Sequence, residues 1–467
     1  NFDLSYTYFR LFKKNIQTFS YLGYREQFVI DIPDLPLILT IIRNYQKKRH
    51  LLEGMDETIK EYIRSRPLGF FKLRNDIVEM YNIINKHLPE IQNHDVVLFT
   101  TYETNLFSTI MCSLLLRQRR RNCLIIYGGP QVTQSDNSRK LVLRLGIADA
   151  VIVGEGEEAL LKILESYRIS KQLVGSGIMS KEKNNNSFRY QPALPADIDN
   201  LPCPDFSLFN LNDYPRRSFE LPLYSSRGCL FRCAFCNEWL LRNNFKQMPP
   251  GKVVEWMKEL HRRFGAVGFR FNDSLVNASL PWLEEFTDIF AKEKLNFTWY
   301  GLFRAQMSPS LARRLKKCGL SRAFIGIEAL SPNLLKKMNK KLTVKDNLNA
   351  IEAFCSCGIP IELGNIVGFP FESKSDFQKR WQGCLDWKKK YGKYVAFNIE
   401  PFQLRPGAPA YENLKDFGLS VKKWDSKVVG MVPEASDIVS KVYMTVKGQP
   451  EPLEVIERFN FMLQSLT

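Results

Sequence analysis

From Asp95 onward, short apolar runs alternate with segments of helical periodicity, and this alternation constrains the fold more than any other feature of the sequence. The first three apolar runs are DVVLFTT, CLIIYGGP and ADAVIVG, and helix-like stretches such as LFSTIMCSLLLRQ separate them. Buried strands that alternate with amphipathic helices predict a parallel, doubly wound sheet, in which ligands bind at the carboxyl ends of the strands. We therefore expect an α/β protein whose binding residues lie in the loops that follow these strands.

A second alternating series begins after the polar segment KEKNNNSFRYQPALPADIDNLPCPDFS, whose Asn, Pro and Asp residues predict an irregular linker. Its strand-like runs are VGFRFND, NFTWYGLFR, RAFIGIEAL, IPIELGNIVGFP and YVAFNIEPFQL, and an extended run before three clustered cysteines adds a sixth. The predicted organisation is a helical N-terminal region (1–94), a first α/β domain (95–180), a linker (181–222), a second α/β domain (223–415) and a helical C-terminal cap (416–467).

Length and composition favour a globular protein of two or three domains, because 467 residues exceed one ordinary core and 45% of them are hydrophobic. The longest apolar run, FVIDIPDLPLILTII, is interrupted by Asp31, Asp34 and two prolines, so no membrane-spanning segment is expected. No secretory signal is recognised, although the chain starts at Asn1. Isolated thiols such as Cys112, Cys123 and Cys318 show no disulfide spacing, which favours a reducing, cytoplasmic location.

The net charge of +17 and the run RQRRR at 117–121 are compatible with a nucleic acid, an acidic membrane surface or an acidic redox partner. Solvated basic faces explain the same composition, and we favour that interpretation. No RNA-binding motif interleaves aromatic and basic residues. Nucleic acid is therefore an unlikely partner, and a basic iron-sulfur protein acting on nucleic acid is kept as a remote alternative.

Glycine-rich loops follow the first three strands: TTYET (100–104), GGPQVT (128–133) and GEGEE (154–158). Glycine lets the backbone approach a flat or phosphate-bearing ligand, and a following helix presents unpaired N–H groups. A dinucleotide is one candidate ligand, but no GxGxxG motif opens a βαβ unit here. A purely structural turn is the alternative for each of these loops.

The segment RGCLFRCAFCNEW places Cys229, Cys233 and Cys236 within eight positions. Three thiolates at this spacing can bind three irons of a cubane cluster and leave the fourth iron without a protein ligand. A structural zinc site would need a fourth ligand, and the next cysteine, Cys318, lies far downstream. A buried apolar group of cysteines is a further minor alternative. Cys355 and Cys357 are interpreted as ordinary core or surface thiols, so one cluster is predicted.

The CxxxCxxC motif, with Phe235 as the aromatic residue before its last cysteine, resembles that of the radical S-adenosylmethionine (SAM) superfamily. The resemblance implies a partial (β/α)6 barrel, a 4Fe-4S cluster and SAM. The GGP-x-x-T and GEGE loops resemble those of the cobalamin-binding domain that precedes many radical SAM enzymes. The implied fold is an N-terminal Rossmann-like cobalamin-binding domain, a central radical SAM barrel and a small helical C-terminal region.

The same resemblance suggests residues that bind SAM. GIEALSP, with the downstream LLKKMNKKLT, resembles the family's fourth-strand segment, with Ala329 in place of its usual serine. GFPFES resembles a turn beside the adenine, and RPGAPAYENL resembles a segment that closes the sixth strand, with Ala408 in place of threonine. A strand-end Glu paired with a neighbouring Arg, or a solvent-facing Arg, is the structural alternative. The implied SAM-binding residues are Phe235, Asp273, Arg304, Glu328, Gly368 and Pro370.

For cobalamin the resemblance implies contacts from the three glycine-rich loops. The familiar DxHxxG motif is missing, and none of His50, His87, His94 and His261 lies in such a context. A bound cobalamin is therefore expected to lack a histidine ligand on cobalt. The implied cobalamin-binding residues are Thr100, Thr101, Tyr102, Gly128, Gly129, Gln131, Val153, Gly154, Glu155 and Gly156.

The implied reaction is methylation of an unactivated carbon of a peptide or natural-product substrate, through a 5′-deoxyadenosyl radical and methylcobalamin. A flavodoxin- or ferredoxin-type protein is the implied electron donor. A cobalamin-dependent radical SAM cyclase or ring-rearranging enzyme that moves no methyl group is the alternative. The residues identify neither the substrate nor a catalytic side chain.

Overall fold

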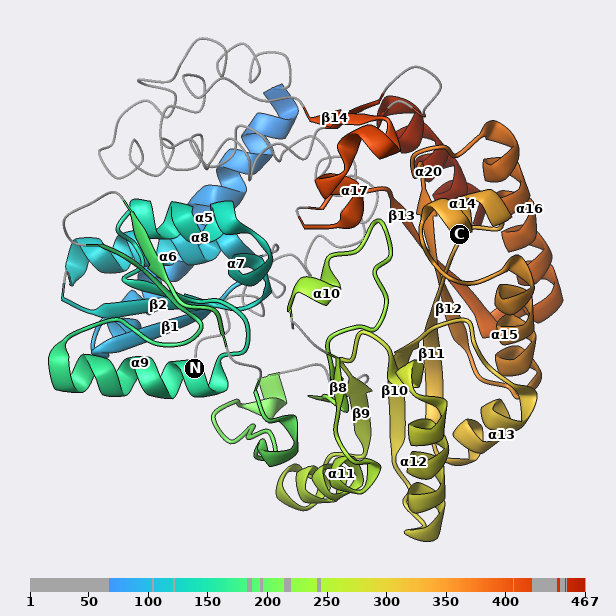
Figure 1. The fold of residues 1–467 in the computed structure, drawn as a ribbon, viewed down its shortest axis with the longest axis horizontal. Helices are drawn as coiled ribbons and strands as arrows, with labels where there is room; N and C mark the ends of the chain where they lie inside the picture. Colours follow the sequence, from blue (N-terminus) through green and yellow to red (C-terminus); the bar gives the residue numbers. More distant parts are fainter. Residues whose placement is uncertain are drawn as a thin grey trace. The chain divides into compact units, whose positions relative to one another are not determined.

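The computed structural model describes most of the chain, and its contacts divide into two compact units (Figure 1). Of the described residues, the N-terminal unit comprises those from Pro67 to Ala196 with Val421 and Tyr443, and the barrel unit comprises those from Asp197 to Ser420 and from Met444 onward. The described residues are 67–102, 105–120, 122–182, 187–193, 196–213, 220–241, 245–405, 407–421, 443–445, 450 and 452–466.

The N-terminal unit is built on a five-stranded sheet in the order β1-β2-β3-β4-β5. Strands β1 to β3 are parallel and correspond to the three apolar runs that predict them, whereas β4 and β5 continue the sheet in antiparallel pairs. The strands are β1 (Val96–Thr100), β2 (Leu124–Gly128), β3 (Ala150–Ile152), β4 (Ile178–Lys181) and β5 (Phe188–Tyr190).

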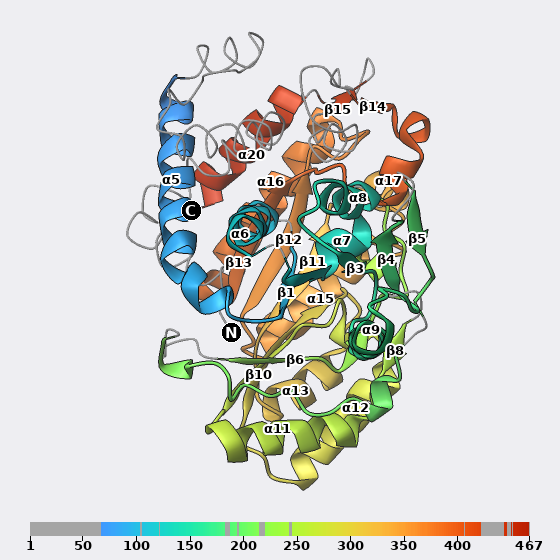
Figure 2. The ribbon, with the colours of Figure 1, turned by 90° about the vertical axis from the view of Figure 1, so that its left-hand side faces the viewer.

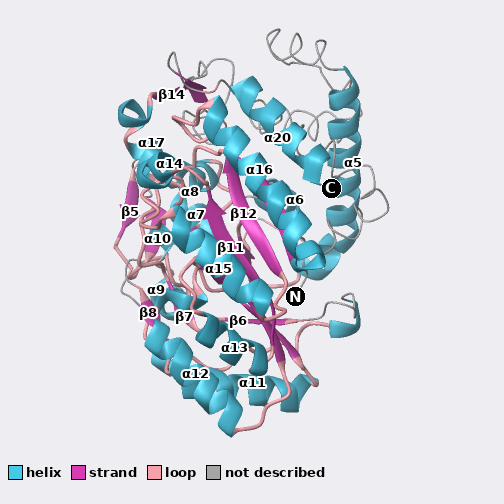
Figure 3. Ribbon diagram, turned by 90° about the vertical axis from the view of Figure 1, so that its right-hand side faces the viewer, coloured by secondary structure: helices cyan, strands magenta, loops and turns pink. Residues whose placement is uncertain are grey.

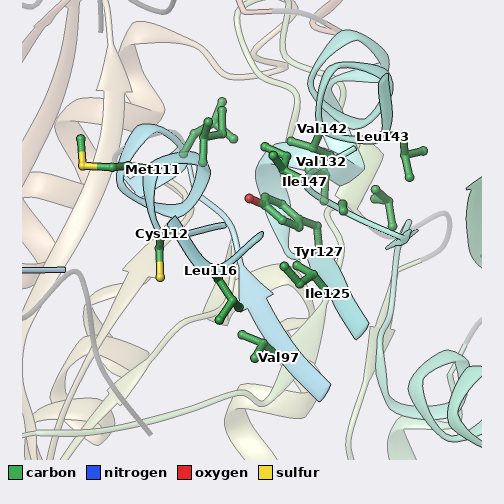
Figure 4. Packing of buried hydrophobic residues seen from close by; sticks show 14 of the residues in the cluster. Val97, Met111, Cys112, Leu116, Ile125, Tyr127, Val132, Val142, Leu143 and Ile147 are labelled. Atoms are coloured by element: carbon green, nitrogen blue, oxygen red, sulfur yellow. The ribbon is translucent and has the colours of Figure 1, made fainter. Parts of the chain in front are cut away.

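Helices cover both faces of this sheet because alternate strand residues are apolar on each side. On one face, Val97, Ile125 and Tyr127 pack with residues of α5, α6 and α8, as Figure 4 shows for part of this core. On the other face, Leu124 and Ile126 pack against α9, which Figure 2 displays beside the sheet. The helices are α5 (Pro67–Ile91), α6 (Leu106–Arg119), α7 (Pro130–Gln134), α8 (Asp136–Arg144) and α9 (Glu157–Ser170).

Two features of this unit differ from the sequence-based expectation. The described parallel strands follow one another in order and never reverse, so they do not form the switch point of a doubly wound sheet. The segment expected to be an irregular linker from residue 181 instead contains β5, which pairs with β4 through Met179 and Tyr190. The chain leaves this unit at Ala196.

Of the N-terminal helical region (1–94), the structure describes α5. The segments PLILTIIRNYQKK and ETIKEYI, on which that prediction depends, lie outside the described residues. In the part of the chain that is described, no helix has both the length and the hydrophobicity needed to cross a membrane.

The basic run at 117–121 is largely committed to internal contacts. Arg117 pairs with Asp149 and also donates to the carbonyls of Gly146 and Cys123. Arg120 pairs with Asp95 and donates to main-chain carbonyls that precede β1. These arginines close the loops at the amino ends of the strands, which supports the structural interpretation of the run.

The barrel unit contains a six-stranded, wholly parallel sheet in the order β13-β12-β11-β10-β9-β6. It confirms the six strands predicted from the second alternating series. Figure 3 shows helices α13, α15 and α16 covering the outer face of the long strands. The strands are β6 (Leu221–Leu223), β9 (Gly268–Phe271), β10 (Thr298–Phe303), β11 (Leu320–Glu328), β12 (Ile361–Val367) and β13 (Val395–Pro401).

An aromatic core joins this sheet to its helices. Trp299 of β10 contacts Phe271 and Phe286 edge-on, with ring centroids 5.1 and 5.6 Å away, and all three side chains are fully buried. The helices are α10 (Glu238–Leu241), α11 (Pro250–Phe264), α12 (Leu280–Lys292), α13 (Pro309–Lys317), α14 (Pro332–Lys337), α15 (Val344–Ser356), α16 (Lys374–Tyr391), α17 (Pro409–Glu412) and α20 (Pro452–Leu466).

The last helix, α20, lies against α16 and the sheet edge at β13, as Figures 1 and 3 both show. Trp381 of α16 donates to Ser465, and Lys388 donates to the carbonyl of Leu466. The remaining elements are short: two-stranded sheets β7 (Ser226–Arg227) with β8 (Lys246–Gln247) and β14 (Leu419–Val421) with β15 (Tyr443–Thr445), and 3-10 turns at Ile198–Asn200, Leu211–Asp213, Val276–Ala278, Gly392–Tyr394 and Leu414–Phe417.

Candidate active site

The three clustered cysteines lie on a loop that leaves the sheet after β6. Gly228 precedes them with φ +82°, a left-handed conformation that turns the chain into the loop and that glycine adopts without strain. Burial raises the pKa of Cys229, and it raises that of Cys236 to about 12. Cys233 raises the pKa of both Cys229 and Cys236 electrostatically, so it lies close to the other two thiols.

Main-chain amides already point at these thiols. The N–H of Phe231 donates to Cys229, and the N–H of Glu238 donates to Cys236 at 3.5 Å. Both bonds favour the thiolate form that binds iron. Within the described residues, no group of three or more Cys, His, Asp or Glu side chains is already arranged around a metal position. The donor set nevertheless fits an iron-sulfur cluster with one iron free of protein ligands.

Two other segments hold the cysteine loop in place. Ala234, in the middle of the loop, donates its N–H to the carbonyl of Met338 at 2.8 Å and accepts from the N–H of Ala410 at 2.9 Å. The side chain of Asn339 donates to the carbonyl of Arg232 at 2.8 Å. The segments at 326–343 and 405–414, predicted to belong to the site, therefore contact the cysteine loop directly.

Asp273 follows β9 and is 2% exposed. Its carboxylate accepts from the N–H and Oγ of Ser225 and from Oγ of Ser226, immediately before the cysteine loop. Burial raises the pKa of Asp273, although these hydrogen bonds oppose the increase. Its contacts thus fix the start of the cysteine loop.

Arg304 follows β10 and is 3% exposed. Its guanidinium carbon lies 3.7 Å from the ring centroid of Phe231 in the cysteine loop, and the side chain also hydrogen-bonds Cys233. Nε and Nη2 have no hydrogen-bond partner among the described residues. Two buried donors therefore remain for a ligand beside the cysteines.

Glu328 ends β11 in a left-handed conformation, with φ +60°. Its Oε1 pairs with Nζ of Lys340 at 2.9 Å, and both side chains are about nine-tenths buried. A Cβ built on Gly326 would lie 2.5 Å from this oxygen, so glycine there leaves room for the ion pair. Glu328 thus has a partner, but it is a lysine rather than the neighbouring arginine of the structural alternative.

Lys340 is a site residue that the sequence analysis did not single out. Its Nζ lies 5.7 Å from the ring centroid of Phe235, and its charge lowers the pKa of Cys229. The lysine in LLKKMNKKLT was the available signal. Its burial depends on a fold that brings α14 beside the cysteine loop, which spacing alone does not reveal.

Gly368 follows β12 with φ +75°, and its N–H is already bonded to Oε2 of Glu372 at 2.8 Å. A Cβ at this glycine would lie 2.3 Å from a methyl carbon of Val455 in α20. Glycine at this position therefore allows the close approach of α20. Pro370 is buried in the same turn.

In the N-terminal unit the predicted loops lie together at the carboxyl edge of the sheet, because Thr100 is paired with Gly128 in the strand register. Thr101 is fully buried, and both its N–H and its Oγ1 donate to the carbonyl of Gly128 at 2.7 Å. Tyr102 is 47% exposed. Thr101 thus joins two loops, whereas Tyr102 is accessible to a ligand.

The second loop is shaped by Gly129, whose φ is +96°. A Cβ here would lie 2.7 Å from the main-chain nitrogen of Thr101. The neighbouring main chain therefore leaves no room for a side chain at this position. Gln131 donates from its main chain to the carbonyl of Thr101 and from its side chain to Ser138 at 2.9 Å. This side chain is already engaged within the unit.

The third loop contains two glycines with different surroundings. Gly154 has φ +96° and donates its N–H to Thr133, whereas Gly156 has φ −92° and no atom within 4 Å of the position that a Cβ would occupy. Val153 is buried, and Glu155 accepts from the N–H of Ala196 at 2.6 Å. Open space at the strand edge is therefore found beside Gly156.

The described histidines of the N-terminal unit lie away from these loops. His94 precedes β1, at the opposite edge of the sheet, and His87 lies on α5 near Glu90. His261 belongs to α11 of the barrel unit, where its ring contacts Phe297. His50 lies outside the described residues.

Residues 223–380 match the model of the radical SAM superfamily. The chain contains a radical SAM domain. The match covers the cysteine loop, Asp273, Arg304 and Glu328, and a domain of this superfamily uses a 4Fe-4S cluster and SAM. The matched segment ends within α16.

Curated relatives extend the similarity beyond the radical SAM domain. The chain is 24% identical over 307 residues to an uncharacterized methyltransferase of Pyrococcus horikoshii, covering 64% of this chain and 65% of that protein. It is also 24% identical over 311 residues to an anaerobic magnesium-protoporphyrin IX monomethyl ester cyclase of Cereibacter sphaeroides, covering 63% and 49%. The aligned part thus spans between half and two thirds of these relatives.

A solved structure shares the fold across both units. The radical SAM methyltransferase TsrM of Kitasatospora setae, solved with cobalamin and a [4Fe-4S] cluster bound, superposes with a TM-score of 0.63 at 16% identity. The superposition covers 83% of this chain and 80% of that one. The α/β architecture with a radical SAM domain is therefore confirmed.

Proposed function

We propose that this protein is a cobalamin-dependent radical SAM enzyme that methylates an unactivated carbon of a peptide or natural-product substrate. The observation that carries the proposal is the assembly of three thiols, the unsatisfied guanidinium of Arg304 and the Glu328–Lys340 pair around one loop. The methyltransferase relatives favour methyl transfer as the outcome.

In the barrel unit, Cys229, Cys233 and Cys236 hold the cluster through thiolates that the main-chain N–H groups stabilise. The free donors of Arg304 suit the carboxylate of SAM, because a guanidinium can donate two parallel hydrogen bonds. Glu328 and Phe235 complete the lining from the strand edge and the loop. Asp273 positions the loop from behind through the two serines.

In the N-terminal unit, the edge at Tyr102, Gly128 and Gly156 is the proposed cobalamin surface. Its backbone is fixed by the Thr101 and Gln131 hydrogen bonds, and Gly156 leaves space beside it. We further propose that cobalamin bound at this edge has no histidine on cobalt. When bound, the cluster and SAM supply the radical that abstracts hydrogen, and cobalamin supplies the methyl group.

The two products of SAM test the reaction. Reconstituted protein is incubated anaerobically with methyl-labelled SAM, a reductant, hydroxocobalamin and fractionated peptide or small-molecule extracts. Methylation predicts deoxyadenosine and S-adenosylhomocysteine in about equal amounts, because each turnover uses one SAM for the radical and one for the methyl group, with one labelled methyl in a product. The Cys229→Ala variant is the control and is expected to give no deoxyadenosine.

A cyclase or rearrangement is the second candidate, which the similarity to a magnesium-protoporphyrin ester cyclase favours. That reaction consumes no methyl group. Substrate-dependent deoxyadenosine without matching S-adenosylhomocysteine, and without a gain of one methyl in mass, would replace methylation by this candidate.

A further inference from the structure

Arg304 is a buried cation without a neutralising carboxylate in contact. It is 3% exposed, and among the described residues no Asp or Glu oxygen lies within 4 Å of its guanidinium. The charged groups that act on it most strongly are Cys233 and Cys229, with Asp346 as a weaker contributor. Asp346 is itself engaged in the helix cap at Thr343. The positive charge of Arg304 therefore interacts mainly with the thiols of the cysteine loop.

The position of Arg304 is fixed from two sides. Its guanidinium stacks on Phe231, which lies between two of the cysteines, at 3.7 Å from the ring centroid. Its main chain is held by Asn277, which accepts from the N–H at 2.8 Å and donates to the carbonyl at 3.0 Å. The charge is thus preorganised beside the cysteines.

Lys340 provides an internal contrast. It is equally buried and also lies near Cys229, but Glu328 pairs with it at 2.9 Å. The carboxylate cancels most of the lysine's field at longer distance. Lys340 thus has a carboxylate in contact, whereas Arg304 has none among the described residues.

We propose that Arg304 sets the reduction potential of the cluster bound by Cys229, Cys233 and Cys236, through its charge and its hydrogen bond to Cys233. This inference rests on the proposed cluster site. A thiolate-ligated cluster becomes more negative when it accepts an electron, so a fixed cation stabilises the reduced form and raises the potential. Burial strengthens this effect because little water screens the charge.

The sign of the charge change makes the inference testable. Arg304→Gln removes a cation and lowers the potential, whereas Glu328→Gln leaves Lys340 uncompensated and raises it. The double variant Glu328→Gln/Lys340→Met removes both charges and returns the potential close to that of the parent protein. A purely structural role for these residues predicts no such opposition.

Arg322→Gln is the matched control. Arg322 also stacks on an aromatic ring, Tyr300, at 4.2 Å, and it pairs with Glu220. It lies near the start of β11, whereas Glu328 ends that strand, so its removal changes the net charge equally without touching the cysteine loop. Its substitution is expected to leave the potential unchanged.

Full-length proteins are reconstituted with iron and sulfide without SAM, assayed for iron and titrated anaerobically while the reduced cluster is followed by electron paramagnetic resonance. At a fixed ambient potential, Arg304→Gln is expected to lower the ratio of reduced to oxidised cluster at least tenfold, which corresponds to about 59 mV for one electron. Glu328→Gln is expected to shift the ratio the other way.

A fully loaded Arg304→Gln cluster with the parent potential, or a shift in the same direction for both variants, would overturn the inference. If Arg304→Gln binds no iron, two other variants test the inference. Arg304→Lys is expected to retain the reduction potential of the parent protein, and Glu328→Gln is expected to raise it. Any other pair of results contradicts the inference. Failure of the parent protein to bind any cluster would instead contradict the proposed function.

Discussion

The two units bury polar groups in opposite ways. In the N-terminal unit the buried polar side chains are neutral hydroxyls, and each has an internal hydrogen-bond partner. All eight buried charged side chains of the described residues lie in the barrel unit: Arg227, Asp273, Arg304, Glu328, Lys340, Glu372, Arg380 and Arg458. Burying an ion costs several kcal/mol unless it is paired. Glu372, Arg380 and Arg458 pair with one another under α20, whereas Arg304 lies beside the cysteine loop with no carboxylate in contact among the described residues.

The contrast suggests two modes of cofactor recognition. The N-terminal unit presents rigid main chain and small residues at its strand edge, which suits a large flat ligand held by shape. The barrel unit presents fixed charges beside nucleophilic sulfur, which suits a charged cluster and a zwitterionic ligand. Substitutions should therefore affect the two units separately.

The largest expected effect follows from the cysteines. Replacing Cys229, Cys233 and Cys236 together with Ala should remove essentially all bound iron and abolish deoxyadenosine formation, because no thiolate remains in the loop. Iron analysis after anaerobic reconstitution measures this. Retention of a full iron complement by the triple variant would show that the cluster lies elsewhere.

The next effect concerns the charge buried under α20. Glu372 accepts from Arg458 at 2.9 Å and pairs with Arg380, so Glu372→Gln leaves the fully buried guanidinium of Arg380 without its counter-charge, whereas Arg458 keeps Glu454 at 2.7 Å. We expect the free energy of unfolding to fall by about 3–5 kcal/mol. Denaturant titration measures it, with Glu352→Gln as the control, because the Glu352–Lys390 pair is exposed to solvent and contributes little to stability. Equal losses in both variants would contradict the distinction.

Two glycines in the N-terminal unit should respond differently. Gly129→Ala forces a left-handed conformation on a residue with a Cβ and brings that atom against Thr101, so a loss above about 1 kcal/mol is expected. Gly156→Ala meets no atom within 4 Å at φ −92°, and its stability should change by less than about 0.5 kcal/mol. Thermal unfolding of both variants measures the difference. Similar values would mean that the loop is not fixed as described.

The smallest expected effect is a pH dependence at Asp273. Because burial raises the pKa of Asp273 in the folded protein, the folded state holds the proton at pH values where the unfolded chain has lost it. Stability from this group is fully present below about pH 3.9 and is lost as pH rises through the folded pKa. Relative to Asp273→Asn, the parent protein should therefore lose stability as pH rises from about 4. A constant difference across this range would contradict the raised pKa.

The strands were predictable because each is a short apolar run followed by turn residues, and the strand-end location of Arg304 and Glu328 followed from that. The reason why residue 129 is a glycine was not predictable. The sequence analysis expected the glycine to let a ligand approach, but in the structure it is the main chain of Thr101 that approaches Gly129 closely. Lys340 and Glu372 were missed because their roles depend on ion pairs with residues of other elements, Glu328 for Lys340 and Arg458 for Glu372. Sequence periodicity locates strand ends, whereas it does not specify which buried charges meet there.

Metal content tests the central claim most directly. The parent protein, the triple cysteine variant and Gly156→Leu are each reconstituted with iron, sulfide and hydroxocobalamin, desalted, and assayed for iron and cobalt. The account predicts both metals in the parent, cobalt without iron in the cysteine variant, and iron without cobalt in Gly156→Leu, whose side chain fills the open strand edge. Absence of cobalt from the parent protein, or loss of cobalt with the cysteines while Gly156→Leu retains it, would contradict the account.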